Sequence, residues 1–268
     1  MDAAVSSGNL SGRAAANKAF AGANFDGWMQ ALVAELDCNS VLDLCCGTGN
    51  QLLLYAGRPE CSRMIGVDLS ADSLDTAAGR LEAAGYVGSL DLENTSMEQV
   101  FKAPDIAEES FTLISCCYGL YYAEDVPAVL DGMVAHLAPG GSLFIVGPYG
   151  SNNQGFFDLL RRHMTLPPLV ERSASSFMPD EVVPFLEKRT TLRTETFVNP
   201  VRYPDTDAVM DYWRKTTFHD FSIEEAVRAD VAAHVATHGC FVIEKHVMAA
   251  IGAVQLSERP LVAELPKD

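Results

Sequence analysis

Residues 41–50, with the sequence VLDLCCGTGN, restrict the possible folds of this chain more than any other stretch. The first four residues form a short apolar run interrupted by one acid, Asp43, which is typical of a buried parallel strand. Gly47 and Gly49 then turn the chain, and residues 51–56 have helical composition. A strand, a tight glycine turn and a helix N-terminus together predict a ligand pocket at the carboxyl edge of a parallel sheet.

Two familiar nucleotide-binding motifs share this geometry, and the residues of the turn argue against both. A dinucleotide motif needs a third glycine three residues after Gly49, where Leu52 stands. A P-loop needs a lysine followed by serine or threonine, and the turn contains no lysine. A second apolar run, residues 64–67, ends at Asp68, nineteen residues after Gly49. An acid at the end of a second strand can accept hydrogen bonds from ribose hydroxyls, so the sequence predicts a nucleoside site.

These two segments closely resemble the first two motifs of the class I S-adenosylmethionine-dependent methyltransferases. The family has a hydrophobic pair, an acid and a loop similar to Gly-Cys-Gly-Thr-Gly, and then a second strand that ends in an acid. Cys45 stands where the family most often has its first glycine, a position that tolerates a small residue. The resemblance implies that Asp43, Cys45, Gly47, Gly49 and Asp68 contact the cofactor, S-adenosylmethionine. It also implies that Asp43 orients the loop and the methionine ammonium, directly or through water.

Further cofactor contacts are implied by the same resemblance. Leu69 follows the ribose acid, where the family places an apolar side chain against the adenine ring. Ser96 and Met97 fall near the position past the third strand that holds the adenine amino group, although the usual acid is absent there. Cys117 ends the fourth strand, residues 111–117, beside the place of the reactive methyl group.

The tyrosines of the next loop, Tyr118 and Tyr121, resemble the post-strand loop of the family and are expected to contact the acceptor. The fourth strand is expected beside the first, where the strand order reverses and open sheets bind ligands. A Pro-Gly-Gly turn at residues 139–141 leads into another apolar strand, as in the family. The resemblance extends over residues 38–147.

The whole pattern predicts an α/β fold: a doubly wound, Rossmann-like sheet of seven mostly parallel strands, with strand seven antiparallel, and a mainly helical cap. We expect an N-terminal helical lid at 1–37, a cofactor-binding core at 38–150 and 241–268, and a substrate cap at 151–240 that includes strand six. Residues 1–12 are rich in Ser, Gly and Ala and are expected to be disordered. Phe20 and Phe25 are candidates to fold over the cofactor, because lid aromatics do so in the family.

The cap should determine which acceptor is used, and its composition suggests a hypothesis. Residues 151–240 contain eight arginines, whose planar guanidinium suits a carboxylate or a phosphate. They also contain many aromatic residues, among which Trp213 is predicted to line an acceptor pocket together with Tyr118 and Tyr121. The layout resembles the small-molecule branch of the family, of the trans-aconitate type. We therefore expect a small-molecule acceptor, methylated on O, N, S or C, with an anionic metabolite or natural-product intermediate as one hypothesis.

Methyl transfer from a sulfonium requires mainly alignment of the acceptor and exclusion of water. A general base is needed only if the acceptor is protonated at working pH. Of the six histidines, His219 lies in a polar and aromatic cluster and is the candidate base, with Tyr118 as a second catalytic candidate. No metal-binding pattern is predicted.

The amino-acid composition limits the classes of partner and the compartment that we expect for this protein. The chain has 36 acidic against 19 basic residues, a net charge of −17, which disfavours a nucleic-acid partner. Its seven cysteines include no Cys-x-x-Cys spacing and are interpreted as reduced and buried, which favours the cytoplasm. No apolar run approaches the roughly 18 residues of a membrane span, and a monomer or a homodimer is expected. A protein of the same fold that binds S-adenosylmethionine for regulation, or for chemistry other than transfer, stays open as an alternative.

Overall fold

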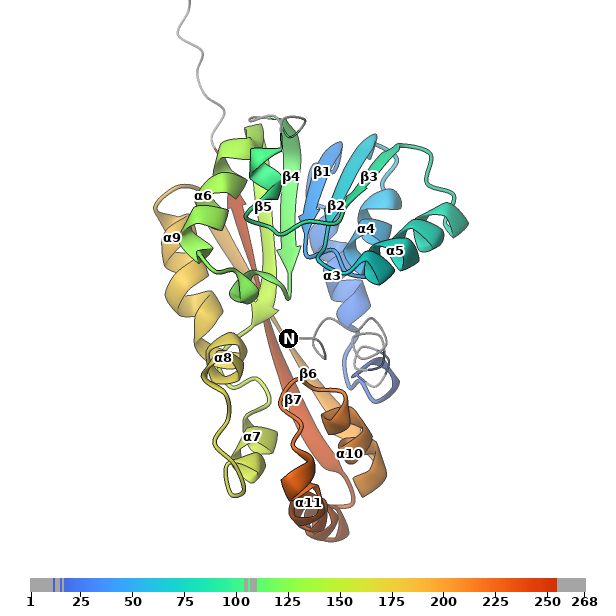
Figure 1. Cartoon of the computed structure of the whole chain (residues 1–268), viewed down its shortest axis with the longest axis vertical. Coiled ribbons are helices and arrows are strands. Elements are labelled where there is room, and N and C mark those ends of the chain that lie inside the picture. The colour runs from blue at the N-terminus through green and yellow to red at the C-terminus, as the bar shows by residue number, and fades with distance from the viewer. Residues whose placement is uncertain (1–11, 13–14, 16, 104–105, 107–109, 255–268) are drawn as a thin grey trace, which may run out of the picture.

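The strands of the chain join into one sheet with the order β3-β2-β1-β4-β5-β7-β6 (Figure 1). The computed structural model describes residues 12, 15, 17–103, 106 and 110–254. The expected disorder of residues 1–12 therefore lies almost wholly outside the described residues. The strand bounds are β1 Ser40–Leu44, β2 Arg63–Val67, β3 Ser89–Glu93, β4 Phe111–Cys117, β5 Leu137–Pro148, β6 Thr191–Tyr203 and β7 Phe241–Ala253.

Strands β1 to β5 pair in parallel, and β7 is antiparallel to both of its neighbours, β5 and β6. β1 lies between β2 and β4, so the strand order reverses beside β1, as the sequence predicts. The mainly apolar strands β1 and β4 are buried because helices cover both of their faces. The predicted doubly wound α/β fold with an antiparallel seventh strand is confirmed.

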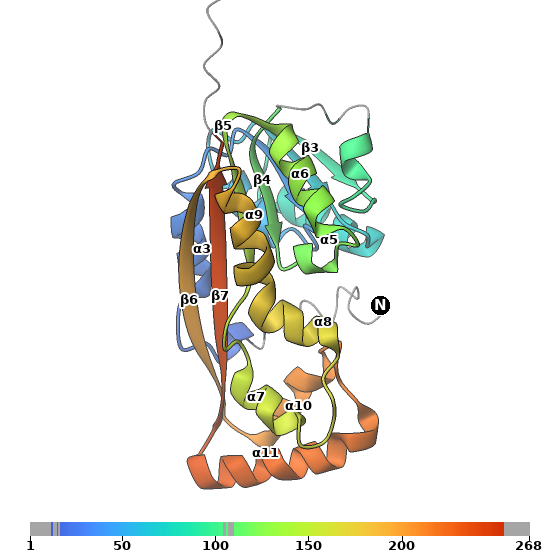
Figure 2. The ribbon, with the colours of Figure 1, turned by 90° about the vertical axis from the view of Figure 1, so that its left-hand side faces the viewer.

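Helices cover the two faces of the sheet (Figures 1 and 2). On one face, a hydrophobic cluster joins side chains of α3, α4 and α5 to Val41 and Leu113. On the other face, α6 and the helical segment 168–187 pack against Leu42 and Ile114. Successive residues of a strand point to opposite faces, so β1 and β4 contribute to both clusters. The bounds are α3 Phe25–Val33, α4 Asn50–Ala56, α5 Ala71–Ala83 and α6 Val126–His136.

The helical segment 168–187 differs from the expected one. The sequence predicts helices at 151–166 and 179–188, whereas α7 spans only Gln154–Leu160 and a further helix begins earlier, at Pro168. This segment consists of α8 (Pro168–Glu171), two π-helical stretches and α9 (Val183–Glu187). Pro179 and Pro184 lie within it. Proline lacks an N–H and clashes with the preceding turn, and we attribute the wider π turns to that restriction.

The cap is built on the ends of β6 and β7, which extend beyond the rest of the sheet (Figure 2). Pro148, the last residue of β5, pairs with Val247, whereas β7 begins at Phe241 and pairs there with Tyr203 of β6. The extended part packs against α7, α10 (Thr206–Arg214) and α11 (Glu224–His238) in a third hydrophobic cluster. The expected cap range therefore includes an edge strand of the main sheet. No helix within the described ranges is long and apolar enough to cross a membrane.

Candidate functional site

The loops that follow β1, β2 and β4 meet at the carboxyl edge of the sheet. The Cys46 amide donates to the Val67 carbonyl at 3.0 Å, and the Asp68 amide donates to the Glu93 carbonyl at 3.2 Å. The Tyr118 amide donates to the Val146 carbonyl at 2.8 Å. These bonds continue the ladders past the strand ends, so the loop backbones are held in a fixed relation to one another.

The loop after β1 adopts the left-handed backbone conformation repeatedly. Gly47 and Gly49 have φ values of 53° and 79°, and Cys45 has a φ of 57°. A side chain is disfavoured there, which explains why the resembling family most often has glycine at the position of Cys45. A Cβ placed on Gly47 would meet no atom within 4 Å, so the space above the loop is open to a ligand.

Asp68 connects this loop to the end of β2. Its Oδ2 accepts from the Gly47 amide at 2.8 Å, and its Oδ1 accepts from the Ser70 amide at 2.9 Å. The Asn94 amide group, past β3, donates to the Asp68 carbonyl at 3.1 Å. Each carboxylate oxygen has a second lone pair, so both can also accept from a ribose hydroxyl. Asp68 therefore lies at the end of β2 against the loop after β1, and its role as the ribose acid remains a prediction.

Asp43 lies beneath the loop, 1% exposed, with a polar environment that is only partly satisfied. The Ser115 hydroxyl donates to its Oδ1 at 2.6 Å, whereas Oδ2 is buried without a hydrogen-bond partner, as is the Tyr55 hydroxyl. Burial raises the pKa of Asp43 to about 7, the Ser115 hydrogen bond opposes that rise, and the charge of Asp68 adds to it. A buried acceptor without a donor costs free energy, so this oxygen fits an ammonium group or a water that bridges to one.

Three residues that the sequence analysis missed support this arrangement. Arg80, in the last turn of α5, donates through Nη1 to the Thr48 carbonyl at 2.6 Å and to the Asn50 side chain at 2.9 Å. It therefore holds the loop between Gly47 and α4. Ser115 and Tyr55 form the polar environment of Asp43. Ser115 could have been noticed as a polar residue inside an apolar strand, but no local signal marks Arg80 or Tyr55.

The other predicted cofactor residues lie at the same edge. Leu69 is 65% exposed beside Asp68, which is unusual for a leucine and suits a ring that packs on it. Ser96 is half-buried, whereas Met97 is buried in the cluster below α6, so any contact from Met97 would use its backbone. Cys117 is buried at the end of β4 on the face of Asp43. These assignments remain predictions.

The central part of the chain is similar to known methyltransferases. Residues 41–141 match a family described as methyltransferase domain. The chain is 26% identical over 210 residues to a demethylmenaquinone methyltransferase of Lactococcus lactis, covering 76% of this chain and 75% of that protein. It is 34% identical over 122 residues to a trans-aconitate 2-methyltransferase of Deinococcus radiodurans, covering 45% of this chain and 42% of that protein. The solved YcgJ protein of Bacillus subtilis matches with a TM-score of 0.61 at 16% identity, covering 85% and 99% of the two chains.

Residues 41–141 thus form a methyltransferase domain of the S-adenosylmethionine-dependent class that the sequence resembles. The matched domain contains β1, the loop after it, Asp43 and Asp68, so the family and the geometry select the same edge of the sheet. S-adenosylmethionine is its cofactor, and the orphaned Asp43 oxygen, the open loop and the Asp68 carboxylate fit it. The chain spans less than half the length of the trans-aconitate relative.

The raised pKa of Asp43 predicts that binding of S-adenosylmethionine depends on pH. Since two positive groups of S-adenosylmethionine favour the ionised carboxylate, binding should release a proton, roughly half a proton per site at pH 7. Affinity should therefore rise as pH rises through about 7. Calorimetry in buffers of different ionisation enthalpy measures this release. Binding without proton release at pH 7 would show that Asp43 is already ionised.

The stability of the protein without cofactor should fall as pH rises, whereas its affinity for the cofactor should rise. Folded Asp43 keeps its proton up to about pH 7, whereas an unfolded aspartate loses it near 3.9. The stability present at low pH is therefore lost as pH rises through about 7. Asp43→Asn should stabilise the unliganded protein above that pH and weaken its binding of S-adenosylmethionine. Thermal melts across pH, with and without the cofactor, check both signs.

Cys45, after β1, and Gly119, after β4, are in close contact at the carboxyl edge of the sheet, which is called the reactive edge below. A Cβ on Gly119 would lie 2.4 Å from the Cys45 Cβ, 2.6 Å from the Cys45 Sγ and 3.4 Å from the Cys116 Sγ. The Cys45 side chain turns toward β4 because its backbone is left-handed. Only glycine fits at position 119 as long as the Cys45 side chain lies against it.

Gly119→Ala should therefore displace the cofactor loop, costing roughly 1–3 kcal/mol of stability and lowering cofactor affinity. The double variant Gly119→Ala with Cys45→Gly should recover much of both losses, because it removes the clashing atoms. Gly79→Ala is the control, since a Cβ there meets nothing within 4 Å. Melting temperature and calorimetric affinity for S-adenosylhomocysteine are the measurements. A fully additive double variant would exclude the clash as the cause.

An aromatic group, formed by Tyr118, Phe25 and Phe197, lies beside the carboxyl end of β4. Tyr118 has a left-handed φ of 59°, which is rare for a bulky residue and concentrates at functional sites. Its ring lies edge-on to Phe25 at 6.4 Å, and Phe25 lies 5.7 Å from Phe197 of β6. Tyr121 lies on the other face of the sheet, 5.8 Å from Phe177. Tyr118 therefore packs toward α3 and β6, whereas Tyr121 packs toward the helical segment 168–187, and the predicted contact of Tyr118 with the acceptor remains a prediction.

Phe20 takes a different position from the one expected. Its ring lies 5.3 Å from Tyr203, and its carbonyl accepts from the Arg202 amide, so it packs on the cap cluster beside β6. Phe25, the second lid candidate, is the residue that contacts Tyr118. The start of α3 places Phe25 at the reactive edge, so it replaces Phe20 as the candidate lid residue.

The predicted roles of Trp213 and His219 require correction. Trp213 is 0% exposed in the cap cluster and presents no surface to a pocket in this structure. The His219 ring lies against Trp213 and Phe221, and its Nε2 is 2.8 Å from Glu224. Residue 219 lies between α10 and α11, which stand away from the carboxyl ends of β1 and β4 (Figure 1). Both residues stabilise the cap, and His219 is not positioned as a base.

The cap arginines do not converge on the site either. Most of them pair with carboxylates at the surface. The pairs are Arg161 with Asp158 and Glu171, Arg162 with Asp230, Arg172 with Glu181, Arg189 with Asp131, Arg193 with Glu35, Arg214 with Asp211 and Glu224, and Arg228 with Asp207. The arginine-based hypothesis of an anionic acceptor therefore loses its structural support. No cluster of three or more potential metal ligands occurs in the part of the chain that the structure describes.

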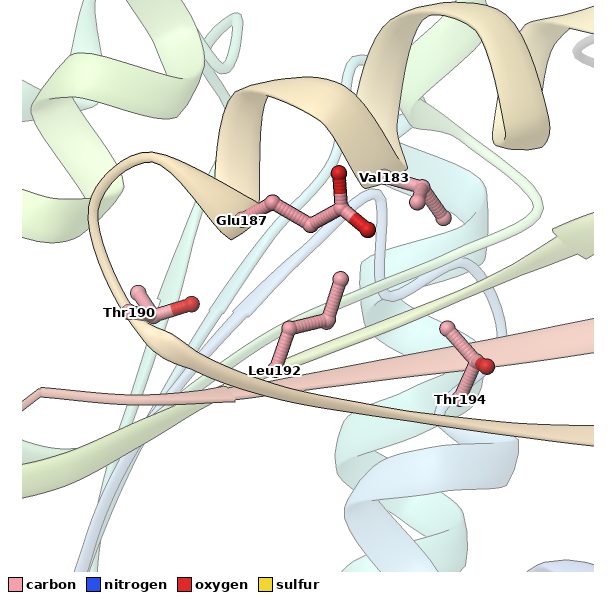
Figure 3. Close-up of a pocket in the computed structure, with 5 residues that line it drawn as sticks. All are labelled: Val183, Glu187, Thr190, Leu192 and Thr194. Atoms are coloured by element: carbon pink, nitrogen blue, oxygen red, sulfur yellow. The ribbon is translucent and has the colours of Figure 1, made fainter.

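A pocket of about 280 Å³ lies elsewhere, between α9 and the start of β6 (Figure 3). Its lining residues are Val183, Glu187, Thr190, Leu192 and Thr194. Thr191 pairs with Ala253, which in turn pairs with Ser142 in the amino-terminal half of β5. The pocket thus lies toward the end of the sheet opposite the cofactor loops, and we do not assign it to catalysis.

Proposed function

We propose that this protein transfers the methyl group of S-adenosylmethionine to a small-molecule acceptor bound between the loop after β4 and the cap. The observation that carries this proposal is the position of the cap. Because β6 and β7 extend past the carboxyl edge, α7 and α10 lie beyond the loops that hold the cofactor (Figures 1 and 2). Such a cap provides walls for a small acceptor and excludes water, which methyl transfer requires.

The protein residues provide binding and orientation. Asp43 and Asp68 would hold the methionine and ribose ends of the cofactor, and Arg80 keeps the loop between them in place. The cofactor supplies an activated methyl group with a good leaving group. Tyr118 and Phe25 border the reactive edge, where an acceptor atom must face the methyl carbon in line with the sulfur.

An acceptor that needs no general base fits best. His219 is paired with Glu224 and His163 with Asp230, both in the cap. A carboxylate, a thiolate or a stabilised carbanion reacts without loss of a proton in the transfer step. Relatives named for demethylmenaquinone and trans-aconitate act on small molecules, which supports the same class here. The net charge of −17 supports a partner other than nucleic acid.

Transfer of a radiolabelled methyl group tests the proposal. The protein is incubated with methyl-labelled S-adenosylmethionine and a mixed extract, which is then separated by mass. Label in the low-mass fraction, lost with Asp68→Ala at limiting cofactor, is the expected result. Label in protein or nucleic acid would contradict a small-molecule acceptor. Binding of S-adenosylhomocysteine without any label across extracts would favour the alternative, a cofactor-binding protein without transfer.

A further inference from the structure

Lys245 of β7 is a cation held by neutral groups. Its Nζ donates to the Asn153 Oδ1 at 2.7 Å and to the Tyr212 hydroxyl at 2.5 Å. It also lies 4.3 Å from the centroid of the Tyr212 ring. Asn153 and Tyr212 are both buried, and Lys245 is half-buried. An ammonium has three donors, so one remains for a further acceptor.

The electrostatic environment of Lys245 differs from that of the cap arginines. Those arginines pair with carboxylates at the surface, whereas no carboxylate of the described residues forms an ion pair with Lys245. This is notable in a chain with 36 acidic residues. A partly buried charge that is compensated only by dipoles is stabilised when an anion joins it.

The register of the strands places Lys245 past the reactive edge. Val247 pairs with Pro148, the end of β5, so Lys245 lies two residues farther, about 7 Å along the strand. Residues two apart share a face, and therefore Lys245 and its partner Asn199 lie on the face of Val247 and Phe197. Phe197 contacts Phe25, which in turn contacts Tyr118. The Lys245 ammonium thus lies on the cap side of the aromatic group formed by Tyr118, Phe25 and Phe197.

From this position we infer that Lys245, with Tyr212 and Asn153, binds an anionic end of the acceptor. The inference rests on the proposed function and specifies its substrate class. The acceptor carries a carboxylate or a phosphate at one end, bound by the ammonium, since a lysine is a point charge that suits either. Its apolar body lies along Phe197, Phe25 and Tyr118, which brings the other end to the methyl group. The anchor is on β7, outside the range 151–240 in which the sequence suggested it.

Three eight-carbon probes test the inference on the full chain with S-adenosylhomocysteine bound. Octanoate and octyl phosphate carry the two anions, and octanamide is the neutral analogue. Calorimetry should show that at least one anionic probe binds tenfold or more tightly than octanamide, and the comparison of the two identifies the anion. Lys245→Met should remove this preference. Lys188→Met, at an exposed lysine next to α9, should keep it.

Other results of the same measurements would overturn the inference about Lys245. Anionic probes that bind no better than octanamide, or as well to Lys245→Met as to the wild type, would overturn the inference. If Lys245→Met does not fold, the wild-type protein with ¹³C-methylated lysines replaces it. Its Lys245 resonance, assigned with Lys245→Arg, should shift with octanoate and not with octanamide, and an unshifted resonance overturns the inference. Failure to bind S-adenosylhomocysteine would instead contradict the proposed function itself.

Discussion

Asp68→Ala is expected to weaken S-adenosylmethionine binding by roughly 1–3 kcal/mol, or about 5- to 150-fold. Two effects combine. The ribose hydroxyls lose a charged acceptor, and the Gly47 and Ser70 amides lose the carboxylate that fixes the loop. Asp68→Asn should be nearly as damaging, because an amide nitrogen at one of these oxygens would face an N–H donor. Calorimetry with S-adenosylmethionine measures the loss.

Asp72→Ala is the matched control for Asp68. Asp72 lies in the first turn of α5 and is exposed, so its removal should leave cofactor affinity almost unchanged. Circular dichroism must show that all variants are folded. An Asp68→Ala protein that is folded and binds the cofactor as the wild type does would exclude Asp68 as the ribose acid.

Trp213→Ala should destabilise the protein by roughly 3–5 kcal/mol. The side chain is 0% exposed, its Nε1–H donates to the Phe218 carbonyl at 3.3 Å, and its ring supports His219. Removing it leaves a cavity between α10 and its neighbours in the cap. For a protein of this size the melting temperature should fall by roughly 10 °C, measured by calorimetry or fluorescence.

Phe221→Ala provides the comparison, because Phe221 is 83% exposed and its removal should change stability by no more than about 0.5 kcal/mol. Cofactor affinity of Trp213→Ala should be nearly normal below its melting temperature, since the loops after β1 and β2 belong to another cluster. A Trp213→Ala protein with normal stability and low turnover would show that Trp213 lines the acceptor pocket and is not a core residue of the cap.

Two residues show why the cap could not be interpreted from composition. An aromatic residue that lines a pocket and one that fills a core have the same side chain, and only packing distinguishes them. Trp213 and His219 satisfy the sequence criteria for a site, but the fold places them among α10, α11 and the extended strands. Lys245 is the opposite case, because nothing in its sequence marks it as a site residue. Only the register of β7 with β5 and β6 places it past the carboxyl end of β5.

The cofactor side of the molecule could be predicted from the sequence. The apolar run before Gly47, the acids Asp43 and Asp68, and their spacing predicted the first two strands and the loop, and the family resemblance that they carry implied the order of the strands. These features are readable because a glycine turn and a strand-end acid are local requirements, satisfied within a few residues along the chain. The same reasoning explains Cys45, whose left-handed backbone is imposed by that turn.

Contacts between segments that are distant in the sequence became visible only in the folded structure. Arg80 reaches back to Thr48, Ser115 donates to Asp43 across neighbouring strands, and Gly119 makes room for Cys45. The length of β6 and β7 beyond β5 determines where the cap stands, and the cap determines which side chains face an acceptor. Such contacts depend on side-chain packing between residues far apart in the chain, and no local pattern encodes the partner of a side chain across that separation.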